Sequence, residues 1–204
     1  YNSPEDRFET LGTTNALATN PPNTQPFRIA YTGLLQVERG LLELLEILKY
    51  HPQWRLDLAG FGGDEERILA FASSMSNVIW HGRVPYERAL QLNAQADILF
   101  ATYDPAIPNH RLSSPNKLFE ALMLGKPIIV ARNTHMDRLV ESIGCGLVIE
   151  YGNRPDLESA LARLHQNPEF RLQMGQKGRR AYEVDFSWSK MQTRLLQLYQ
   201  EVCA

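Results

Sequence analysis

The sequence predicts an α/β fold, with a Rossmann-like parallel sheet of about six strands flanked by helices. From Phe27 onward, short apolar runs alternate with segments of helix length, and several runs are apolar almost throughout. Continuous apolar runs are typical of strands covered on both faces, and strand–helix–strand alternation predicts parallel strands with right-handed crossovers. Ligands of such sheets bind beyond the carboxyl ends of the strands, so we expect function in the loops that follow them.

The predicted elements divide the chain into three parts. Residues 1–26 are predicted to be a linker or arm, because Pro21, Pro22 and Pro26 discourage regular structure. Residues 27–184 form the Rossmann-like domain, and 185–204 an amphipathic C-terminal helix. The predicted strands are 27–33, 54–60, 77–82, 97–102, 127–131 and 146–150. The predicted helices lie near 40–50, 64–75, 86–95, 115–124, 135–143, 155–166, 168–183 and 187–202.

Composition excludes several classes of protein. The 204 residues carry a formal net charge of −2 and no block of like charges, which argues against nucleic acid as the main partner. No apolar run approaches the ~20 residues that cross a bilayer. Cys145 and Cys203 lack metal-ligand or redox spacing and are interpreted as reduced thiols of a cytoplasmic protein.

The loop after the first strand, GLLQVERG, is a candidate phosphate site. Gly33 and Gly40 allow tight turns, and Arg39 stands at the start of the next helix, where free N–H groups suit an anion. A solvated surface arginine is an equally good interpretation. The loop after the second strand, GFGGDEE at 60–66, is interpreted as structural. Its three acidic residues, Asp64, Glu65 and Glu66, suit helix capping and exclude a dinucleotide phosphate site.

Two later loops complete the candidate site. In HGRVPYE, Gly82 follows a strand, and the exposed backbone of Arg83–Val84 is suited to the edge of a base, although an ordinary strand-to-helix turn fits as well. The long loop from Tyr103 to Ser114 is of a length that is uncommon without a function.

The helix that follows this loop, within SSPNKLFEALMLGKPIIVA, carries Lys117 and Glu120. Ser114 is predicted to be its N-cap, and Gly125 to follow its last turn. The helix dipole disfavours a lysine in the first turn, so Lys117 is expected to reach an anionic ligand. Glu120 is expected to accept hydrogen bonds from two vicinal hydroxyls of a sugar. A plain i,i+3 salt bridge between the two is the alternative.

Taken in order, these features resemble the C-terminal, donor-binding domain of GT-B-fold glycosyltransferases, most closely glycosyltransferase family 4 (group 1). The resemblance covers nearly the whole chain, and PNKLFEALMLGKPIIVA is its specific part. Supporting stretches are LDLAGFG, NVIWHGRV, ADILFATYD, ESIGCGLVIE and DFSWSKMQTRLLQLYQEV.

The resemblance implies a role for each site residue. Glu120 matches the second glutamate of the family's paired motif, which holds the nucleotide ribose, and Arg39 matches the basic residue at the diphosphate. Arg83 and Val84 match the loop that lines the base pocket. Catalytic candidates are Arg39, Lys117 and Glu120. Candidate donor-binding residues are Gly33, Leu34, Arg39, Gly82, Arg83, Val84, Tyr103, Arg111, Ser113, Ser114, Asn116, Lys117, Leu118 and Glu120.

Two positions depart from the family pattern. The first glutamate of the pair would fall at Leu112, and a basic residue often found after the first glycine would fall at Leu34. Lys117 is expected to take part of the missing role. These departures bear on the contacts to the donor sugar rather than on the nucleotide site.

The resemblance implies a hexosyltransferase that works with retention of anomeric configuration, without cofactor or metal. Its substrates would be a UDP- or GDP-sugar donor and a glycan or lipid-linked acceptor in polysaccharide biosynthesis, in the cytoplasm or at the inner face of the membrane. The acceptor domain would precede Tyr1, and the apolar stripe of the last helix would pack toward it. That stripe comprises Trp188, Met191, Leu195, Leu198, Tyr199 and Val202.

Three alternatives remain open from the sequence. A GT-B nucleotide-sugar epimerase would need further acid/base groups, for which His110 is the one candidate. A non-catalytic nucleotide-sugar-binding domain is favoured by Leu112 and Leu34. Weak peripheral membrane association through Lys177, Arg179 and Arg180 is less expected than a solvated basic face.

Overall fold

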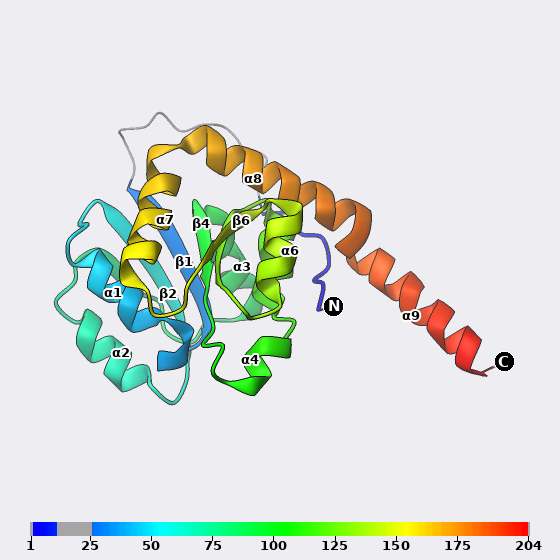
Figure 1. Ribbon diagram of the computed structural model, residues 1–204, viewed down its shortest axis with the longest axis horizontal. Helices are drawn as coiled ribbons and strands as arrows, with labels where there is room; N and C mark the ends of the chain where they lie inside the picture. The colour runs from blue at the N-terminus through cyan, green and yellow to red at the C-terminus, as the bar shows by residue number, and fades with distance from the viewer. Residues whose placement is uncertain (1, 12–25, 204) are drawn as a thin grey trace.

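The computed structural model describes residues 2–11 and 26–203, and in them six parallel strands form one sheet (Figure 1). The strand order is β3-β2-β1-β4-β5-β6, and every neighbouring pair is parallel. The predicted Rossmann-like α/β fold is therefore confirmed. The strands are β1 (Phe27–Leu34), β2 (Trp54–Phe61), β3 (Val78–Trp80), β4 (Ile98–Ala101), β5 (Ile128–Ala131) and β6 (Gly146–Ile149).

Helices cover both faces of the sheet and create two apolar cores. On one face α1, α2 and α7 bury leucines and isoleucines against β1 and β2, and on the other α3, α5 and α6 pack against β4 and β5. The helices are α1 (Leu41–Leu48), α2 (Glu65–Ala72), α3 (Tyr86–Gln95), α4 (Pro108–Leu112), α5 (Asn116–Leu124), α6 (Met136–Ile143), α7 (Arg154–Gln166), α8 (Pro168–Ala181) and α9 (Trp188–Cys203). A 3₁₀ turn η2 (Val37–Arg39) precedes α1, and a π-helix η3 (Tyr182–Phe186) joins α8 to α9.

The direction of strand addition reverses at β1, which lies between β2 and β4. A reversal of this kind leaves a crevice outside the carboxyl ends of the strands. At that end Gly33 of β1 pairs with Gly60 of β2, and a Cβ added to Gly60 would lie 1.8 Å from the Gly33 carbonyl oxygen. Glycine is therefore required at Gly60 for the two strand ends to approach this closely.

Local chemistry differs from the sequence-based expectation at the starts of α5 and α2. Pro115, and not the predicted Ser114, is the N-cap residue of α5. Asp64 is the N-cap residue of α2, but its carboxylate accepts a hydrogen bond from the backbone N–H of Val37 at 2.9 Å instead of capping its own helix. The long loop from Tyr103 to Ser114 contains the short helix α4, which was not predicted from the sequence.

Residues 2–11 pack against the domain. The carboxylate of Asp6 accepts hydrogen bonds from the Arg179 guanidinium at 2.8 and 2.6 Å, and the Tyr182 hydroxyl donates to the carbonyl of Pro4 at 2.6 Å. The Phe8 ring is buried and lies beneath the same guanidinium. Residues 12–25 of the predicted linker lie outside the described residues.

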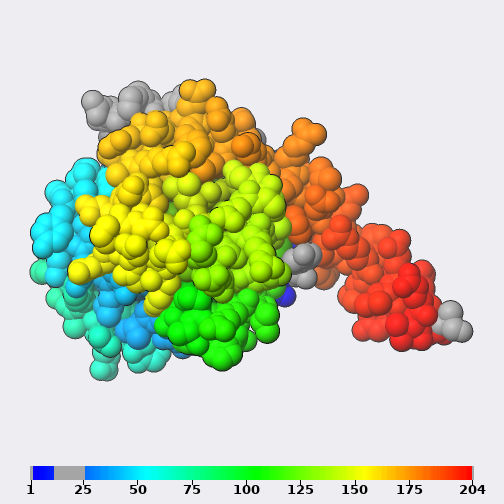
Figure 2. Space-filling view, viewed as in Figure 1, coloured from blue at the N-terminus to red at the C-terminus, as the bar shows by residue number. Residues whose placement is uncertain are grey.

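Helix α9 projects away from the rest of the chain (Figures 1 and 2). None of its residues is buried, and its apolar stripe is exposed, including Trp188, Leu195, Leu198, Tyr199 and Val202. The predicted amphipathic helix is present, and within the described chain its stripe packs against no core.

The basic stretch on α8 is not a uniform solvated face. Arg179 forms salt bridges with Asp6 and Glu183, which removes it from the predicted lipid-facing group, whereas Lys177 and Arg180 are exposed. Among the described residues, no helix is long and apolar enough to span a bilayer. Cys145 is buried, Cys203 is exposed, and no disulfide joins them.

Candidate functional site

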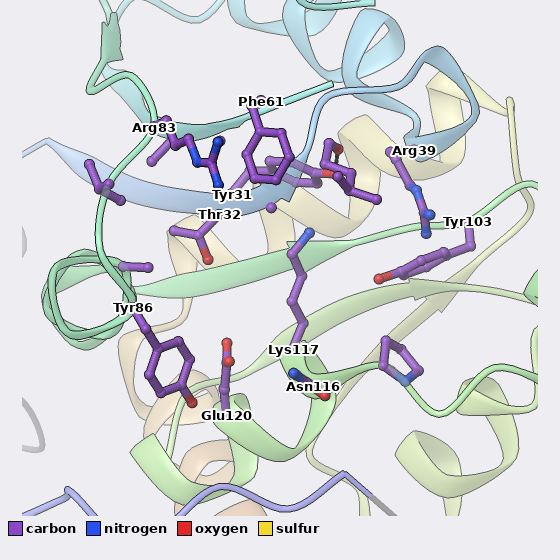
Figure 3. A pocket seen from close by; sticks show the side chains of 17 residues that line it. Tyr31, Thr32, Arg39, Phe61, Arg83, Tyr86, Tyr103, Asn116, Lys117 and Glu120 are labelled. Atoms are coloured by element: carbon purple, nitrogen blue, oxygen red, sulfur yellow. Dashed lines mark hydrogen bonds between the residues drawn. The ribbon is translucent and has the colours of Figure 1, made fainter. Parts of the chain in front are cut away.

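A pocket of about 410 Å³ opens at the carboxyl ends of β1 and β2, beside the reversal between β1 and β4 (Figure 3). Residues of both strands, of η2 after β1, of the loops after β3 and β4, of α3 and of the start of α5 line it. Its lining residues are Tyr31, Thr32, Gly33, Leu34, Arg39, Ala59, Gly60, Phe61, Arg83, Val84, Tyr86, Ala89, Tyr103, Pro115, Asn116, Lys117 and Glu120.

Arg39 is held at one end of the pocket by contacts on both sides. Its guanidinium carbon lies 4.1 Å from the centroid of the Tyr103 ring, and it donates to the side-chain oxygen of Gln36 at 3.2 Å. The hydroxyl of Thr102 donates to the carbonyl of Arg39 at 2.9 Å and fixes the backbone there. The guanidinium has no acidic partner among the described residues, so its charge is available to an anion in the pocket.

Lys117 lies in the first turn of α5, and its Nζ sits 3.5 Å from the centroid of the Tyr31 ring. Within the described chain no salt bridge joins Lys117 to Glu120, so the plain i,i+3 ion pair is not what the structure has. Burial lowers the pKa of Lys117 to about 7, with the charge of Arg39 adding to the effect and that of Glu120 opposing it. A bound anion would favour the protonated form.

Glu120 lines the same pocket one turn further along α5, with 5% of its surface exposed. Its Oε2 accepts from the Asn93 side-chain amide at 3.3 Å, and the Tyr86 hydroxyl donates toward the carboxylate. Burial raises the pKa of Glu120, while the charge of Lys117 and the Tyr86 hydroxyl lower it. The carboxylate therefore faces the same pocket as Arg39.

The opposite end of the pocket is formed by the Phe61 ring and by the loop after β3, which contains Arg83 and Val84. The guanidinium of Arg83 lies 4.4 Å from the centroid of the Phe61 ring, and Val84 lies beside it in the lining. Gly82 does not line the pocket but makes the turn that leads there, with φ of +72° and its carbonyl accepting from the Gly60 N–H at 2.9 Å.

Several predicted site residues lie outside the pocket. Arg111 points away and donates to the Pro105 carbonyl, and Leu118 is buried in the apolar core. The Ser113 hydroxyl donates to the His110 carbonyl at 3.3 Å, and the Ser114 carbonyl accepts from Asn2 at 2.8 Å. None of these four residues, nor Gly82, is part of the lining.

Two residues that raised alternatives are also placed elsewhere. His110 is the buried residue of α4, with Nδ1 3.0 Å from the Asp104 carbonyl and its ring edge-on to Tyr103. Its ring is not part of the lining, which removes the acid/base candidate for an epimerase. Leu112 is 83% exposed at the end of α4, whereas Leu34 does line the pocket.

Several lining residues on the strands and on α3 were not predicted from the sequence. Tyr31 and Thr32 come from β1 and Tyr86 from the first turn of α3. The interpretation of loop 60–66 as purely structural was wrong in part, since Gly60 and Phe61 line the pocket. An aromatic residue directly after the carboxyl end of a strand was the signal available for Phe61. Among the described residues, no group of three or more His, Cys, Asp or Glu side chains could hold a metal ion.

Comparison with known proteins places the chain in a family. The model of a family described as glycosyl transferase-like matches residues 39–197. A D-inositol 3-phosphate glycosyltransferase of Corynebacterium jeikeium is 28% identical over 194 residues, which cover 87% of this chain and 45% of that protein. A GDP-mannose-dependent monoacylated alpha-(1-6)-phosphatidylinositol monomannoside mannosyltransferase of Corynebacterium glutamicum is 26% identical over 97% of this chain and 52% of its own length.

Solved structures agree on the fold. Anabaena HepE in complex with UDP-glucose matches with a TM-score of 0.78 at 16% identity, over 98% of this chain and 56% of that one. Sucrose-phosphate synthase from Thermosynechococcus elongatus matches with a TM-score of 0.73 at 17% identity, over 98% of this chain and 51% of that one. The chain thus spans about half the length of these relatives. It belongs to the glycosyl transferase-like family and has the fold of a GT-B glycosyltransferase domain.

Proposed function

We propose that this chain is the donor-binding domain of a retaining glycosyltransferase and that its pocket holds a UDP- or GDP-sugar. The observation that carries the proposal is the meeting of one carboxylate and two cations at the carboxyl ends of the central strands. Glu120, Lys117 and Arg39 come from different segments and face one cavity of about 410 Å³. That volume is in the range of pockets that bind small molecules.

Each part of a nucleotide diphosphate sugar has a matching part of the pocket. Glu120 offers a carboxylate to the two hydroxyls of a ribose, and hydrogen bonds to charged groups contribute about 1.5–3 kcal/mol each. Arg39 and Lys117 offer positive charge to the diphosphate, and the exposed backbone near Arg83 and Val84 faces the base. Asn116 at the start of α5 and Leu34 at the end of β1 would border the donor sugar.

The proposed chemistry follows from these charges. The bond between the anomeric carbon of the sugar and the diphosphate oxygen breaks, and the nucleotide leaves with the electron pair. Negative charge therefore grows on the diphosphate in the transition state, where Arg39 and protonated Lys117 stabilise it more strongly than in the ground state. The acceptor hydroxyl attacks from the face that the nucleotide leaves and passes its proton to the departing diphosphate oxygen, which gives retention and requires no metal or cofactor.

Neighbouring proteins support both nucleotides as candidates for the donor. Anabaena HepE is described in complex with UDP-glucose, and the Corynebacterium glutamicum relative is named as GDP-mannose-dependent. The base-facing end of this pocket offers Arg83, Val84 and Phe61 to either base. UDP and GDP are therefore tested side by side.

We further propose that the complete protein has an acceptor domain and that the apolar stripe of α9 packs against it. The exposed row from Trp188 to Val202 supports this, since single surface apolar residues are ordinary but a contiguous stripe indicates a partner. The acceptor would be a glycan or a lipid-linked sugar at the cytoplasmic face of a membrane. The exposed side chains of Lys177 and Arg180 would contact anionic lipid there. Flotation tests this: more protein should be recovered with anionic liposomes than with neutral ones.

The deciding experiment is calorimetric titration of UDP and GDP into the chain, with and without EDTA. One of the two is expected to bind with a micromolar dissociation constant that EDTA does not change. Glu120→Gln should weaken binding at least tenfold, because the amide replaces one accepting oxygen with a donor. Glu169→Gln, on the exposed first turn of α8, is the control and should bind as wild type. Absence of binding by both nucleotides would refute the proposal.

A further inference from the structure

The Glu120 carboxylate is held from behind by a chain of buried polar side chains. Thr32 and Asn93 exchange two hydrogen bonds: the Thr32 hydroxyl donates to Asn93 Oδ1 at 3.2 Å, and Asn93 Nδ2 donates to Thr32 Oγ1 at 3.1 Å. The same Nδ2 donates to Glu120 Oε2 at 3.3 Å. Thr32, Asn93 and Glu120 are all buried. Because an ionised carboxylate only accepts hydrogen bonds, the contact with Glu120 requires the Nδ2 end of the Asn93 amide to face it, and the Thr32 hydroxyl can pair with either end.

Tyr86 approaches the same carboxylate from another side. Its ring lines the pocket from the first turn of α3, and its hydroxyl lies beside Glu120 (Figure 3). Burial raises the pKa of Tyr86, and the nearby carboxylate raises it further, so the hydroxyl keeps its proton and remains a donor. Two neutral donors from α3 therefore converge on one carboxylate of α5.

We infer that Tyr86 and Asn93 are positioning residues, which orient Glu120 so that its remaining lone pairs face a vicinal diol in the pocket. This inference rests on the proposed binding of a nucleotide by this pocket. A carboxylate has about four accepting positions, so the two donors from α3 leave two for the paired hydroxyls of a ribose. Neither residue needs to touch the nucleotide, because each acts through Glu120.

A purely structural role for Asn93 makes a different prediction. If the Asn93 side chain served only as a hydrogen-bond partner for the buried Thr32 hydroxyl, its removal would change the free energy of unfolding but not the pKa of Glu120. The charged and titratable groups around the carboxylate are Lys117 on α5, Tyr86 on α3 and Tyr103 after β4, with Arg39 acting on Lys117. Burial already raises the pKa of Glu120, so loss of a donor should raise it further.

The test is the affinity for UDP and GDP between pH 5 and pH 8.5 for the 204-residue chain and three variants. Tyr86→Phe removes one donor, Asn93→Leu removes the other at similar volume, and Tyr50→Phe, on a fully separate exposed surface, is the control. For the nucleotide that binds, affinity declines at low pH as Glu120 is protonated. The midpoint of this decline, called the acid limb, should lie about one pH unit higher in each of the first two variants. Affinity at pH 8 should fall threefold to tenfold, and Tyr50→Phe should match wild type.

A second readout uses the sugar itself. Wild type should bind UDP more tightly than 2′-deoxy-UDP, because the ribose of the deoxy compound offers one hydroxyl instead of two. If GDP is the ligand, wild type should prefer GDP to 2′-deoxy-GDP for the same reason. Tyr86→Phe and Asn93→Leu should reduce that preference by at least threefold, since a carboxylate free to turn no longer matches two hydroxyls. A general loss of packing would weaken both ligands equally.

The outcomes separate this inference from the proposed function. If wild type binds a nucleotide but both variants keep its acid limb and its preference for the ribose, the positioning role is wrong and the proposed function stands. If wild type binds neither UDP nor GDP at any pH, both are overturned. Should Asn93→Leu fail to fold, Tyr86→Phe decides alone. Tyr86 is 50% exposed, so removal of its hydroxyl should leave the chain folded.

Discussion

The Nζ of Lys117 lies 3.5 Å from the centroid of the Tyr31 ring, so that an ammonium in the first turn of a helix rests on an aromatic face. The positive end of the α5 dipole and the nearby Arg39 both disfavour that charge. A cation–π contact contributes about 0.5–2 kcal/mol, which offsets only part of this cost. A cation held in such a place has a clear use only when an anion enters the pocket.

The first prediction concerns replacement of this lysine. Since the pKa of Lys117 is lowered to about 7 in the folded state, folding opposes its protonation, and its contribution to stability falls as pH drops from about 10 toward 7. Lys117→Met should therefore stabilise the unliganded chain at pH 7 by on the order of 1–2 kcal/mol and lower its affinity for nucleotide diphosphate at least tenfold. Urea denaturation and calorimetric titration measure the two effects.

Lys177→Met, on the exposed face of α8, is the matched control and should change neither quantity. The gain in stability should shrink above pH 9, where the lysine is neutral in the folded chain and increasingly so in the unfolded one. A variant that lost stability at pH 7, or bound as tightly as wild type, would contradict this account of Lys117.

The second prediction concerns the glycine that makes room for the ammonium. A Cβ on Gly33 would lie 3.0 Å from Lys117 Nζ, and its φ of +149° is strained for any other residue. Gly33→Ala should destabilise the chain by about 1–3 kcal/mol and weaken nucleotide binding, because the lysine must move off the Tyr31 ring. Gly63→Ala is the control, since nothing lies within 4 Å of its added Cβ. Equal effects of the two substitutions would refute the specific role of Gly33.

The sequence predicted the parts of the site that follow from order along the chain. Apolar runs located the strands, and the rule that loops after parallel strands carry function located Arg39, Arg83 and Lys117. It also predicted Glu120, because a carboxylate inside an apolar helix requires a partner. These inferences rest on local sequence patterns alone, so residues of the pocket lining could be named without coordinates.

What the sequence did not predict depends on contacts between distant segments. Asn93 on α3 reads as an ordinary polar helix residue until Thr32 and Glu120 are placed beside it. Ser114 reads as a helix start facing a ligand, yet its carbonyl is taken by the side chain of Asn2. These hydrogen-bond partners lie 27, 61 and 112 residues apart, so they leave no local pattern to detect.

The third prediction concerns a buried carboxylate that supports the base-facing loop. Asp57 on β2 accepts from Arg55 at 2.7 Å and lies 2.8 Å from Nε2 of His81, the residue before Gly82. Burial raises the pKa of Asp57, but the hydrogen bonds from Arg55 and His81 outweigh it and the pKa is lowered overall. The stability it contributes is therefore present above its unfolded pKa, near 3.8, and is lost as pH falls through the folded value.

Asp57→Asn should accordingly lower the free energy of unfolding by about 1–3 kcal/mol at pH 7, and by less near pH 3, because the wild-type contribution declines once the pH is below the unfolded pKa of 3.8. Urea denaturation at the two pH values measures this. Asp185→Asn, at an exposed position of η3, should be neutral at both. A loss that was the same at pH 3 and pH 7 would show that charge is not the cause.

The fourth prediction concerns the segment 2–11. Arg179 fastens it through both oxygens of Asp6, donates to the Met123 carbonyl at 2.9 Å, and covers the Phe8 ring. Arg179→Leu should speed hydrogen exchange of the backbone amides of residues 7–11 at least tenfold, because their anchor on α5 and α8 is lost. Arg180→Leu, its exposed neighbour, should leave their exchange unchanged. Unaltered exchange in both variants would contradict the anchoring role.

The last prediction concerns α9, whose apolar stripe the domain does not use. Since no residue of α9 is buried, removal of residues 188–204 should leave the melting temperature of the chain within about 3 °C of wild type. A longer deletion from residue 182 also removes Tyr182 and Phe186, which are buried in the core beside α5. Each such aromatic contributes about 3–5 kcal/mol, so the longer deletion should unfold the domain. Circular dichroism melts compare the two, and a comparable loss in both would mean that α9 stabilises this domain rather than serving a surface outside it.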